Sequence, residues 1–165
     1  MSDNRAFALE HEIKQIAPFE TVAIGPEKYN ELYTKIANLN RLLAWGHARA
    51  LENLLARVAP LEVVSDQFGD KSLIENALLK KGRGVKLTQM TKAESIPAVA
   101  AASILARAEF LRRLRALSTQ YGIELPKGAG AQVDEAGRRF ISAKGRGELG
   151  KVAKIHFKNT RRIVD

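Results

Sequence analysis

The spacing of apolar residues along the chain predicts several helices. Apolar positions recur every three or four residues over residues 3–16, and Pro18 ends this pattern. The same period returns over residues 27–58, where Gly46 can interrupt the helix and Pro60 ends it. Further helical patterns cover residues 71–81, 97–121 and 133–143.

Three short apolar runs between these helices predict strands. They cover residues 19–24, 61–66 and 85–90. Strands that alternate with helices are typical of an α/β protein with a mainly parallel sheet and helices on both faces. Three strands leave an open sheet edge, which a partner, self-association or an unexpected local strand would cover. No linker divides the sequence, so we expect a single domain over residues 1–165.

Composition excludes several classes of protein. The 165 residues contain no cysteine, which excludes a disulfide framework and a cysteine-ligated zinc site. No run approaches the roughly 20 apolar residues of a membrane-spanning helix, and the polar N-terminus lacks the pattern of a signal peptide. The sequence therefore predicts a cytoplasmic globular protein.

Charge is distributed unevenly along the chain. The formal net charge is +9. Residues 1–79 hold 8 Lys and Arg against 11 Asp and Glu, whereas residues 80–165 hold 19 against 7. A basic half favours a polyanionic partner such as nucleic acid. Basic residues that only solvate helix faces are an equally good explanation of charge alone.

Asp66 is a candidate metal ligand because it ends an apolar strand pattern. Ligand groups of open α/β sheets gather at the carboxyl ends of strands. The alternative is that Asp66 only ends the strand or caps the next helix.

Glu94 is the second candidate carboxylate. Thr91 and Glu94 have capping-box spacing, but Pro97 would then lie inside the helix, where it clashes with the preceding turn. A cap at Ser95 places Pro97 in the tolerated first turn. Glu94 then precedes the helix and can face the strand ends, near Asp66 if the two strands are neighbours.

Two further segments contain candidate substrate contacts. Lys127 and Gly128 lie in a glycine-containing loop, where close backbone approach allows Lys127 to contact a phosphate. An exposed loop lysine without function is the alternative. His156 is a candidate substrate contact, although its spacing to the other histidines fits no metal site and a structural histidine is the more common case.

The order of several segments resembles ribonuclease HIII, a type 2 ribonuclease H. The segments are Lys28-Tyr-Asn30, Asn38-Leu-Asn40 with Ala44-Trp45 and His47, Thr91-Lys-Ala-Glu94, Ser95-Ile-Pro97, Ala98–Arg107, Leu125-Pro-Lys-Gly-Ala-Gly130 and Lys154–Thr160. The resemblance implies a ribonuclease H-like α/β fold that is incomplete at its N-terminus, because no Asp-Glu segment on a first strand is found. It covers nearly all of the chain.

The resemblance also implies an activity and its residues. Such enzymes hydrolyse the RNA strand of RNA–DNA hybrids with two Mg²⁺ or Mn²⁺ ions. The catalytic and metal-binding roles fall on Asp66 and Glu94, which are two of the four carboxylates that the family uses. We therefore expect little or no activity of this chain alone. The alternatives are a nucleic-acid-binding relative without catalysis and an interaction module that pairs through its open sheet edge.

Overall fold

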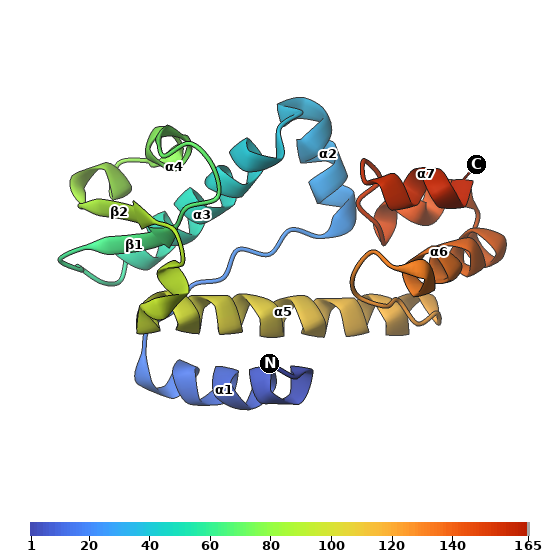
Figure 1. Ribbon diagram of the computed structural model, residues 1–165, viewed down its shortest axis with the longest axis horizontal. Coiled ribbons are helices and arrows are strands. Elements are labelled where there is room, and N and C mark those ends of the chain that lie inside the picture. Colours follow the sequence, from blue (N-terminus) through green and yellow to red (C-terminus); the bar gives the residue numbers. More distant parts are fainter. Residues whose placement is uncertain (165) are drawn as a thin grey trace. The chain divides into compact units, whose positions relative to one another are not determined.

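The computed structural model describes residues 1–164 and divides into two compact units. Unit 1 comprises Met1–Val22 and Ile36–Glu109, and unit 2 comprises Ala23–Lys35 and the described residues from Phe110 onward. Figure 1 shows the elements of both units in chain order. Among residues 1–164, no helix is long and apolar enough to cross a membrane.

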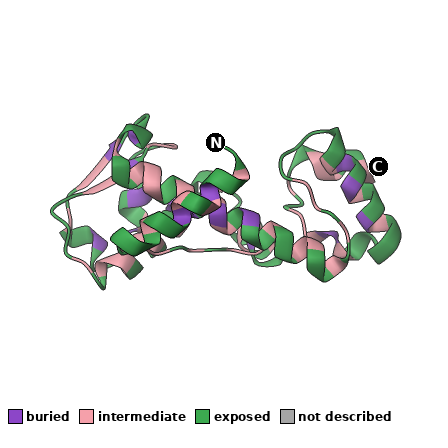
Figure 2. Ribbon diagram, turned by 90° about the horizontal axis from the view of Figure 1, so that it is seen from below, coloured by how far each residue is buried: buried purple, intermediate pink, exposed green. Residues whose placement is uncertain are grey.

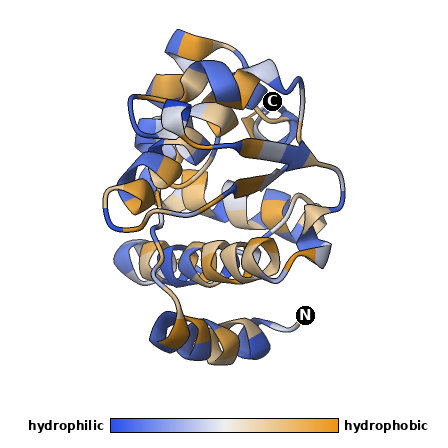
Figure 3. Cartoon of the chain, turned by 90° about the vertical axis from the view of Figure 1, so that its left-hand side faces the viewer, coloured by the Kyte–Doolittle hydropathy of each residue, from blue (hydrophilic) through white to orange (hydrophobic). Residues whose placement is uncertain are grey.

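Helix α1 of unit 1 spans Asp3–Ile16, as the sequence predicts. It begins where the Ser2 hydroxyl accepts the backbone N–H of Arg5 at 3.3 Å. It ends at Ala17, next to Pro18, which cannot continue the helical hydrogen bonds. Apolar and polar positions alternate around α1, as Figure 3 shows by colour.

The prediction of one long helix over residues 27–58 was wrong. The segment forms helix α2 (Pro26–Ile36) and helix α3 (Leu39–Leu55). The chain breaks at Ala37, whose φ of 50° is left-handed. The Asn38 side chain then caps α3 by accepting the Arg41 N–H at 3.0 Å. Gly46 lies inside α3 without interrupting it.

Residues 1–164 contain one sheet, which has two parallel strands. Strand β1 (Val63–Asp66) pairs with strand β2 (Leu87–Met90), and Asp66 lies opposite Met90. The crossover between them contains helix α4 (Ser72–Ala77) and the 3₁₀ turn η1 (Gly82–Gly84), so the predicted helix over 71–81 is shortened. Figure 1 shows the two strands side by side.

The predicted strand over residues 19–24 does not form. In the structure this run has no regular secondary structure and belongs to no sheet. The backbone carbonyl of Phe19 accepts a hydrogen bond from Arg57 Nη1 at 3.2 Å. A side chain therefore satisfies a group that a neighbouring strand would otherwise bond.

The core of unit 1 lies between α3, α4 and the sheet. Its buried residues are Ala44, Ala48, Ile74 and Leu78, and partly buried neighbours are Leu51, Phe68, Leu73, Ala77 and Leu87. Figure 2 shows buried positions interspersed with exposed ones along the helices. The small alanine side chains of α3 allow α4 to pack closely on it. This packing fixes the crossover that joins β1 to β2.

The segment after β2 leads into the longest helix. The 3₁₀ turn η2 (Ala93–Ser95) comes first, and helix α5 (Pro97–Tyr121) follows with the predicted bounds. The cap lies one residue later than predicted. The carbonyl of Ile96, instead of that of Ser95, accepts the first helical N–H groups, from Val99 and Ala100, at 3.0 Å.

Unit 2 contains helix α6 (Ala131–Lys144), the 3₁₀ helix η3 (Arg146–Lys151) and helix α7 (Lys158–Val164). Phe140 of α6 is fully buried, and its ring meets that of Tyr121 edge-on at 5.3 Å between centroids. A Cβ on Gly137 would lie 2.5 Å from Ile163 Cδ1, so a larger residue at this position would require the end of the Ile163 side chain to move.

Candidate functional site

Asp66 occupies the carboxyl end of β1 and is exposed. The backbone N–H of Ala93 donates to Asp66 Oδ1 at 3.2 Å. The ladder extends one residue beyond the strands, because the N–H of Gln67 donates to the carbonyl of Met90 at 3.0 Å. These two bonds tie the Asp66 carboxylate to the segment that leaves β2.

Glu94 lies in that segment, inside η2, and is exposed. It precedes α5, as the sequence predicts. The turn η2 has no side-chain cap, so the alternative capping box of Thr91 and Glu94 is not formed. The Ser95 hydroxyl donates to the Lys92 carbonyl at 3.2 Å.

The structure brings the surroundings of Asp66 and Glu94 together within unit 1. Ala93 is bonded to Asp66 and is the direct chain neighbour of Glu94. Elements β1 and η2 are in contact. Parallel pairing explains this, because the carboxyl ends of neighbouring parallel strands meet at the same edge. We name Asp66, Ala93 and Glu94 the strand-end cluster.

A histidine without an assigned role borders the strand-end cluster. His47 Nδ1 lies 3.4 Å from Ser65 Oγ, and its ring meets Phe68 edge-on at 4.9 Å between centroids. Burial lowers the pKa of the His47 ring, while the charge of Asp66 acts in the opposite direction. A neutral ring next to the strand end follows at neutral pH. Sequence reasoning did not assign His47 a role, because its long separation from Ser65 gives no spacing signal.

The strand-end cluster fits part of a divalent cation's ligand shell. Carboxylate oxygens are the ligands that Mg²⁺ and Mn²⁺ prefer. Within residues 1–164, no group of three or more His, Cys, Asp or Glu residues is arranged to hold a metal ion. The next carboxylate along the loop, Asp70, accepts the Ser72 N–H through Oδ1 at 2.8 Å, and bonding by Ser72 lowers the pKa of Asp70.

Lys127 and Gly128 lie in unit 2, in the loop between α5 and α6, and both are exposed. Gly128 has a φ of 101°, a backbone conformation that favours glycine. These two candidate substrate contacts therefore belong to a different unit from Asp66 and Glu94.

His156 also belongs to unit 2, where it lies in a stack of aromatic rings. Its ring is parallel to that of Tyr33 at 3.8 Å between centroids and tilted against that of Phe157 at 4.2 Å. His156 Nδ1 is buried without a hydrogen-bond partner. Burial, and then the charge of Lys154, lower the pKa of His156. The ring faces are thus occupied by protein, so a substrate would have to meet the ring edge.

The two units differ in charge. Unit 2 carries 15 Lys and Arg against 7 Asp and Glu, which is a net charge of +8. Unit 1 carries 12 against 11, which is a net charge of +1. The basic half predicted from the sequence is therefore concentrated in unit 2.

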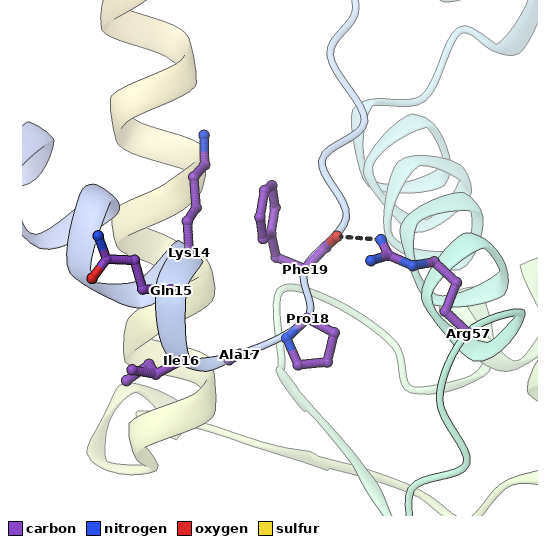
Figure 4. A pocket seen from close by; sticks show the side chains of 7 residues that line it. All are labelled: Lys14, Gln15, Ile16, Ala17, Pro18, Phe19 and Arg57. Carbon is purple, nitrogen blue, oxygen red and sulfur yellow. Dashed lines mark hydrogen bonds between the residues drawn. The ribbon is translucent and has the colours of Figure 1, made fainter.

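A surface hollow of unit 1 contains none of the predicted site residues. It has a volume of about 360 Å³ and lies at the end of α1. Figure 4 shows its lining residues, which are Lys14, Gln15, Ile16, Ala17, Pro18, Phe19 and Arg57. Both cations already have acidic partners, since Lys14 pairs with Glu10 and Arg57 with Glu20, each at 2.7 Å.

Solved structures establish the fold class. The chain superposes on Bst-RNase HIII in complex with Mn²⁺ with a TM-score of 0.91 and 30% identity, over 99% of this chain and 55% of that one. It superposes on ribonuclease H2 of Pyrococcus horikoshii OT3 with a TM-score of 0.79 and 21% identity, over 99% of this chain and 76% of that one. The fold is therefore the predicted ribonuclease H-like α/β fold.

Sequence comparison establishes the family. The family model of Ribonuclease HII matches residues 1–160, so the chain belongs to this family. It is 40% identical to Ribonuclease HIII of Chlamydia abortus, over 100% of this chain and 56% of the relative. It is 41% identical to Ribonuclease HIII of Protochlamydia amoebophila, over 99% of this chain and 54% of that relative. The predicted resemblance to ribonuclease HIII is confirmed, and the chain spans about half the length of these curated relatives.

Proposed function

We propose that this chain contributes Asp66 and Glu94 to the catalytic site of an endoribonuclease that hydrolyses the RNA strand of RNA–DNA hybrids. The observation that carries the proposal is the bond from the Ala93 N–H to Asp66 Oδ1, which joins the end of β1 to the turn that holds Glu94. Membership of the ribonuclease HII family supports the same reaction.

Asp66 and Glu94 would hold Mg²⁺ or Mn²⁺, and a Mn²⁺ complex is the state of one solved relative. Such an ion activates water and stabilises the leaving oxygen when bound. A carboxylate can accept several bonds at once, so the bond from Ala93 orients Asp66 and leaves capacity for a cation. Both side chains are exposed, which keeps them accessible to a phosphodiester.

Unit 2 is proposed to bind the nucleic acid backbone. Its net charge of +8 attracts phosphates. Lys127 beside Gly128 would supply a point charge to one phosphate, and the edge of His156 would supply a further substrate contact.

Two carboxylates leave a two-ion site incomplete. We propose that the remaining oxygen ligands come from a further polypeptide segment or from a second copy of the chain at the sheet edge. The two strands described here present backbone groups that another strand can pair. We expect residues 1–165 to act as one domain, in the cytoplasm, and to show at most trace cleavage without the additional ligands.

The test is cleavage of a labelled RNA–DNA hybrid in Mn²⁺. Any cleavage should be lost in Asp66→Asn and in Glu94→Gln. When catalytic groups act as a unit, removal of one of them lowers the reaction rate by orders of magnitude. Glu75→Gln, which removes an exposed carboxylate of α4, is the control and should cleave like the parent chain. Cleavage that survives Asp66→Asn would refute the assigned role of Asp66.

A second candidate function is binding of nucleic acid without catalysis. The concentration of positive charge in unit 2 favours it independently of Asp66 and Glu94. Hybrid binding at low ionic strength by a chain that cleaves nothing, even at high concentration in Mn²⁺, would support this candidate over the first. Absence of binding would eliminate it.

A further inference from the structure

A left-handed residue separates β2 from the strand-end cluster. Among residues 1–164, the non-glycine residues with positive φ are Ala37 and Lys92. Lys92 has a φ of 56° and a ψ of 37°. This conformation is unfavourable for a residue with a Cβ, because the Cβ comes too close to the following carbonyl oxygen. Strained backbone persists where surrounding structure holds it, and such residues gather at functional sites.

The hydrogen bonds around Lys92 show what holds it. Its carbonyl accepts the Ser95 hydroxyl at 3.2 Å and the Ser95 N–H at 3.3 Å. The N–H of the next residue, Ala93, donates to Asp66 Oδ1 at 3.2 Å. Three hydrogen bonds therefore depend on the turn that Lys92 makes, and one of them ends on the candidate metal ligand.

An ordinary backbone at Lys92 would break this arrangement. Changing φ from 56° to the usual value near −60° rotates one side of the residue against the other by roughly 120°. With β2 fixed by its pairing to β1, the rotation would carry the Ala93 N–H away from Asp66. Glu94, the next residue, would be displaced with it.

We propose that Lys92 is a positioning residue, whose left-handed backbone places Glu94 beside Asp66 for joint binding of a divalent cation. Lys92 acts through its backbone, so its ammonium group is not required. The proposal rests on the proposed function, because it assumes that Asp66 and Glu94 share an ion. It adds a residue that has no part in the metal shell itself.

The experiment compares variants of Lys92 in the full chain by Mn²⁺ affinity, measured from the electron paramagnetic resonance signal of free Mn²⁺. Lys92→Val should weaken Mn²⁺ affinity by about tenfold or more, as loss of a group that orients a ligand does, because β-branched residues avoid positive φ. Lys92→Thr is a milder β-branched replacement that decides the question if Lys92→Val does not fold.

Two replacements separate backbone from side chain. Lys92→Gly adopts the same φ without strain, and Lys92→Ala keeps the Cβ but removes the ammonium group. Both should bind Mn²⁺ like the parent chain. Ala37→Val is the matched control, since it places the same β-branched strain at the other left-handed residue and should leave Mn²⁺ affinity unchanged.

Two results would overturn the proposal. One is unchanged Mn²⁺ affinity in folded Lys92→Val or Lys92→Thr, and the other is an equal loss in Lys92→Ala, which would assign the effect to the ammonium group. Hydrogen exchange of the Ala93 amide gives a readout without metal, and it should accelerate in Lys92→Val but not in Ala37→Val. If the parent chain binds no Mn²⁺, the proposed function fails, while the exchange data still test the positioning role of Lys92.

Discussion

Two aspartates show how differently the two units use a carboxylate. Asp66 of unit 1 is exposed at a strand end and accepts one backbone N–H. Asp134 of unit 2 is buried and accepts Asn159 Nδ2 at 2.7 Å and Arg162 Nε at 2.8 Å. The first carboxylate retains capacity for a ligand from outside the protein. The second is consumed by contacts that hold α7 against α6.

Charge and chemistry are therefore separated in this chain. Unit 1 holds the candidate metal ligands but has a net charge of only +1. Unit 2 has a net charge of +8, and its buried carboxylate, Asp134, forms a structural contact with Arg162. The excess of positive charge and the candidate metal ligands therefore lie in different units. Changes in one unit should leave the property of the other intact.

The largest expected effect is the salt dependence of hybrid binding, which we assign to unit 2. If six to ten phosphates are contacted, affinity should fall by about 10³–10⁵ between 50 and 200 mM salt. Replacing exposed Lys158 and Arg161 by Glu should lower the slope of log K against log salt by about two.

The matched control reverses two charges in unit 1. Replacing exposed Lys80 and Lys81 by Glu should leave the slope unchanged. Fluorescence anisotropy of a labelled hybrid over a series of salt concentrations measures both variants. If both pairs of substitutions lower the slope equally, the assignment of hybrid binding to unit 2 is wrong.

The next effect is on stability. Phe140→Ala in unit 2 and Ile74→Ala in unit 1 each empty a fully buried site, which should cost about 3–5 and 2–5 kcal/mol of unfolding free energy. Hydrogen exchange followed by mass spectrometry should show the lost protection mainly in the unit that carries each substitution. Equal loss across both units would show that they unfold together.

Much of this architecture follows from local sequence. The bounds of α1 and α5 were predicted because apolar spacing outlines both helices and because Pro18 and Pro97 mark helix ends chemically. The place of Asp66 at a strand end was predicted from the apolar run before it. Each of these features depends on residues close together in the chain.

Other features depend on contacts that the sequence does not display. The break between α2 and α3 needs a left-handed Ala37, a residue type that gives no turn signal. The run 19–24 has strand composition, but its Phe19 carbonyl is bonded by distant Arg57 instead of a strand. The contact of His47 with Ser65 and the packing of His156 against Tyr33 likewise join residues far apart in sequence.

A smaller expected effect is the stabilisation of the fold by Mn²⁺, which should depend on Asp66. Mn²⁺ should stabilise the parent chain by about 2.7 kcal/mol at a hundred times its dissociation constant. Asp66→Asn should abolish this stabilisation and leave hybrid binding in the absence of metal unaltered, because we assign the binding to unit 2. Thermal melts with and without Mn²⁺ measure the effect. If Mn²⁺ does not change the melting temperature of the parent chain, Asp66 and Glu94 do not bind the ion.

The smallest expected effect is the pH dependence that Asp134 gives to unit 2. Hydrogen bonds from Arg162, and then from Asn159, lower the pKa of the Asp134 carboxyl below its ordinary value. A lowered pKa in the folded state means that the stabilisation is fully present above the pKa of the unfolded chain and is lost as the pH falls through the folded pKa.

Acid should therefore release α7 from α6 in the parent chain, which a fall in the hydrogen-exchange protection factors of Lys158–Val164 would report. Asp134→Asn should show the lower protection factors already at neutral pH, with little further change in protection in acid. Asp66→Asn is the control. The hydrogen bond described for the Asp66 side chain comes from the Ala93 backbone in the same unit, so this variant should leave the acid response of α7 intact. An acid response that persists in Asp134→Asn would assign it to another carboxyl group and remove the contrast between the two aspartates.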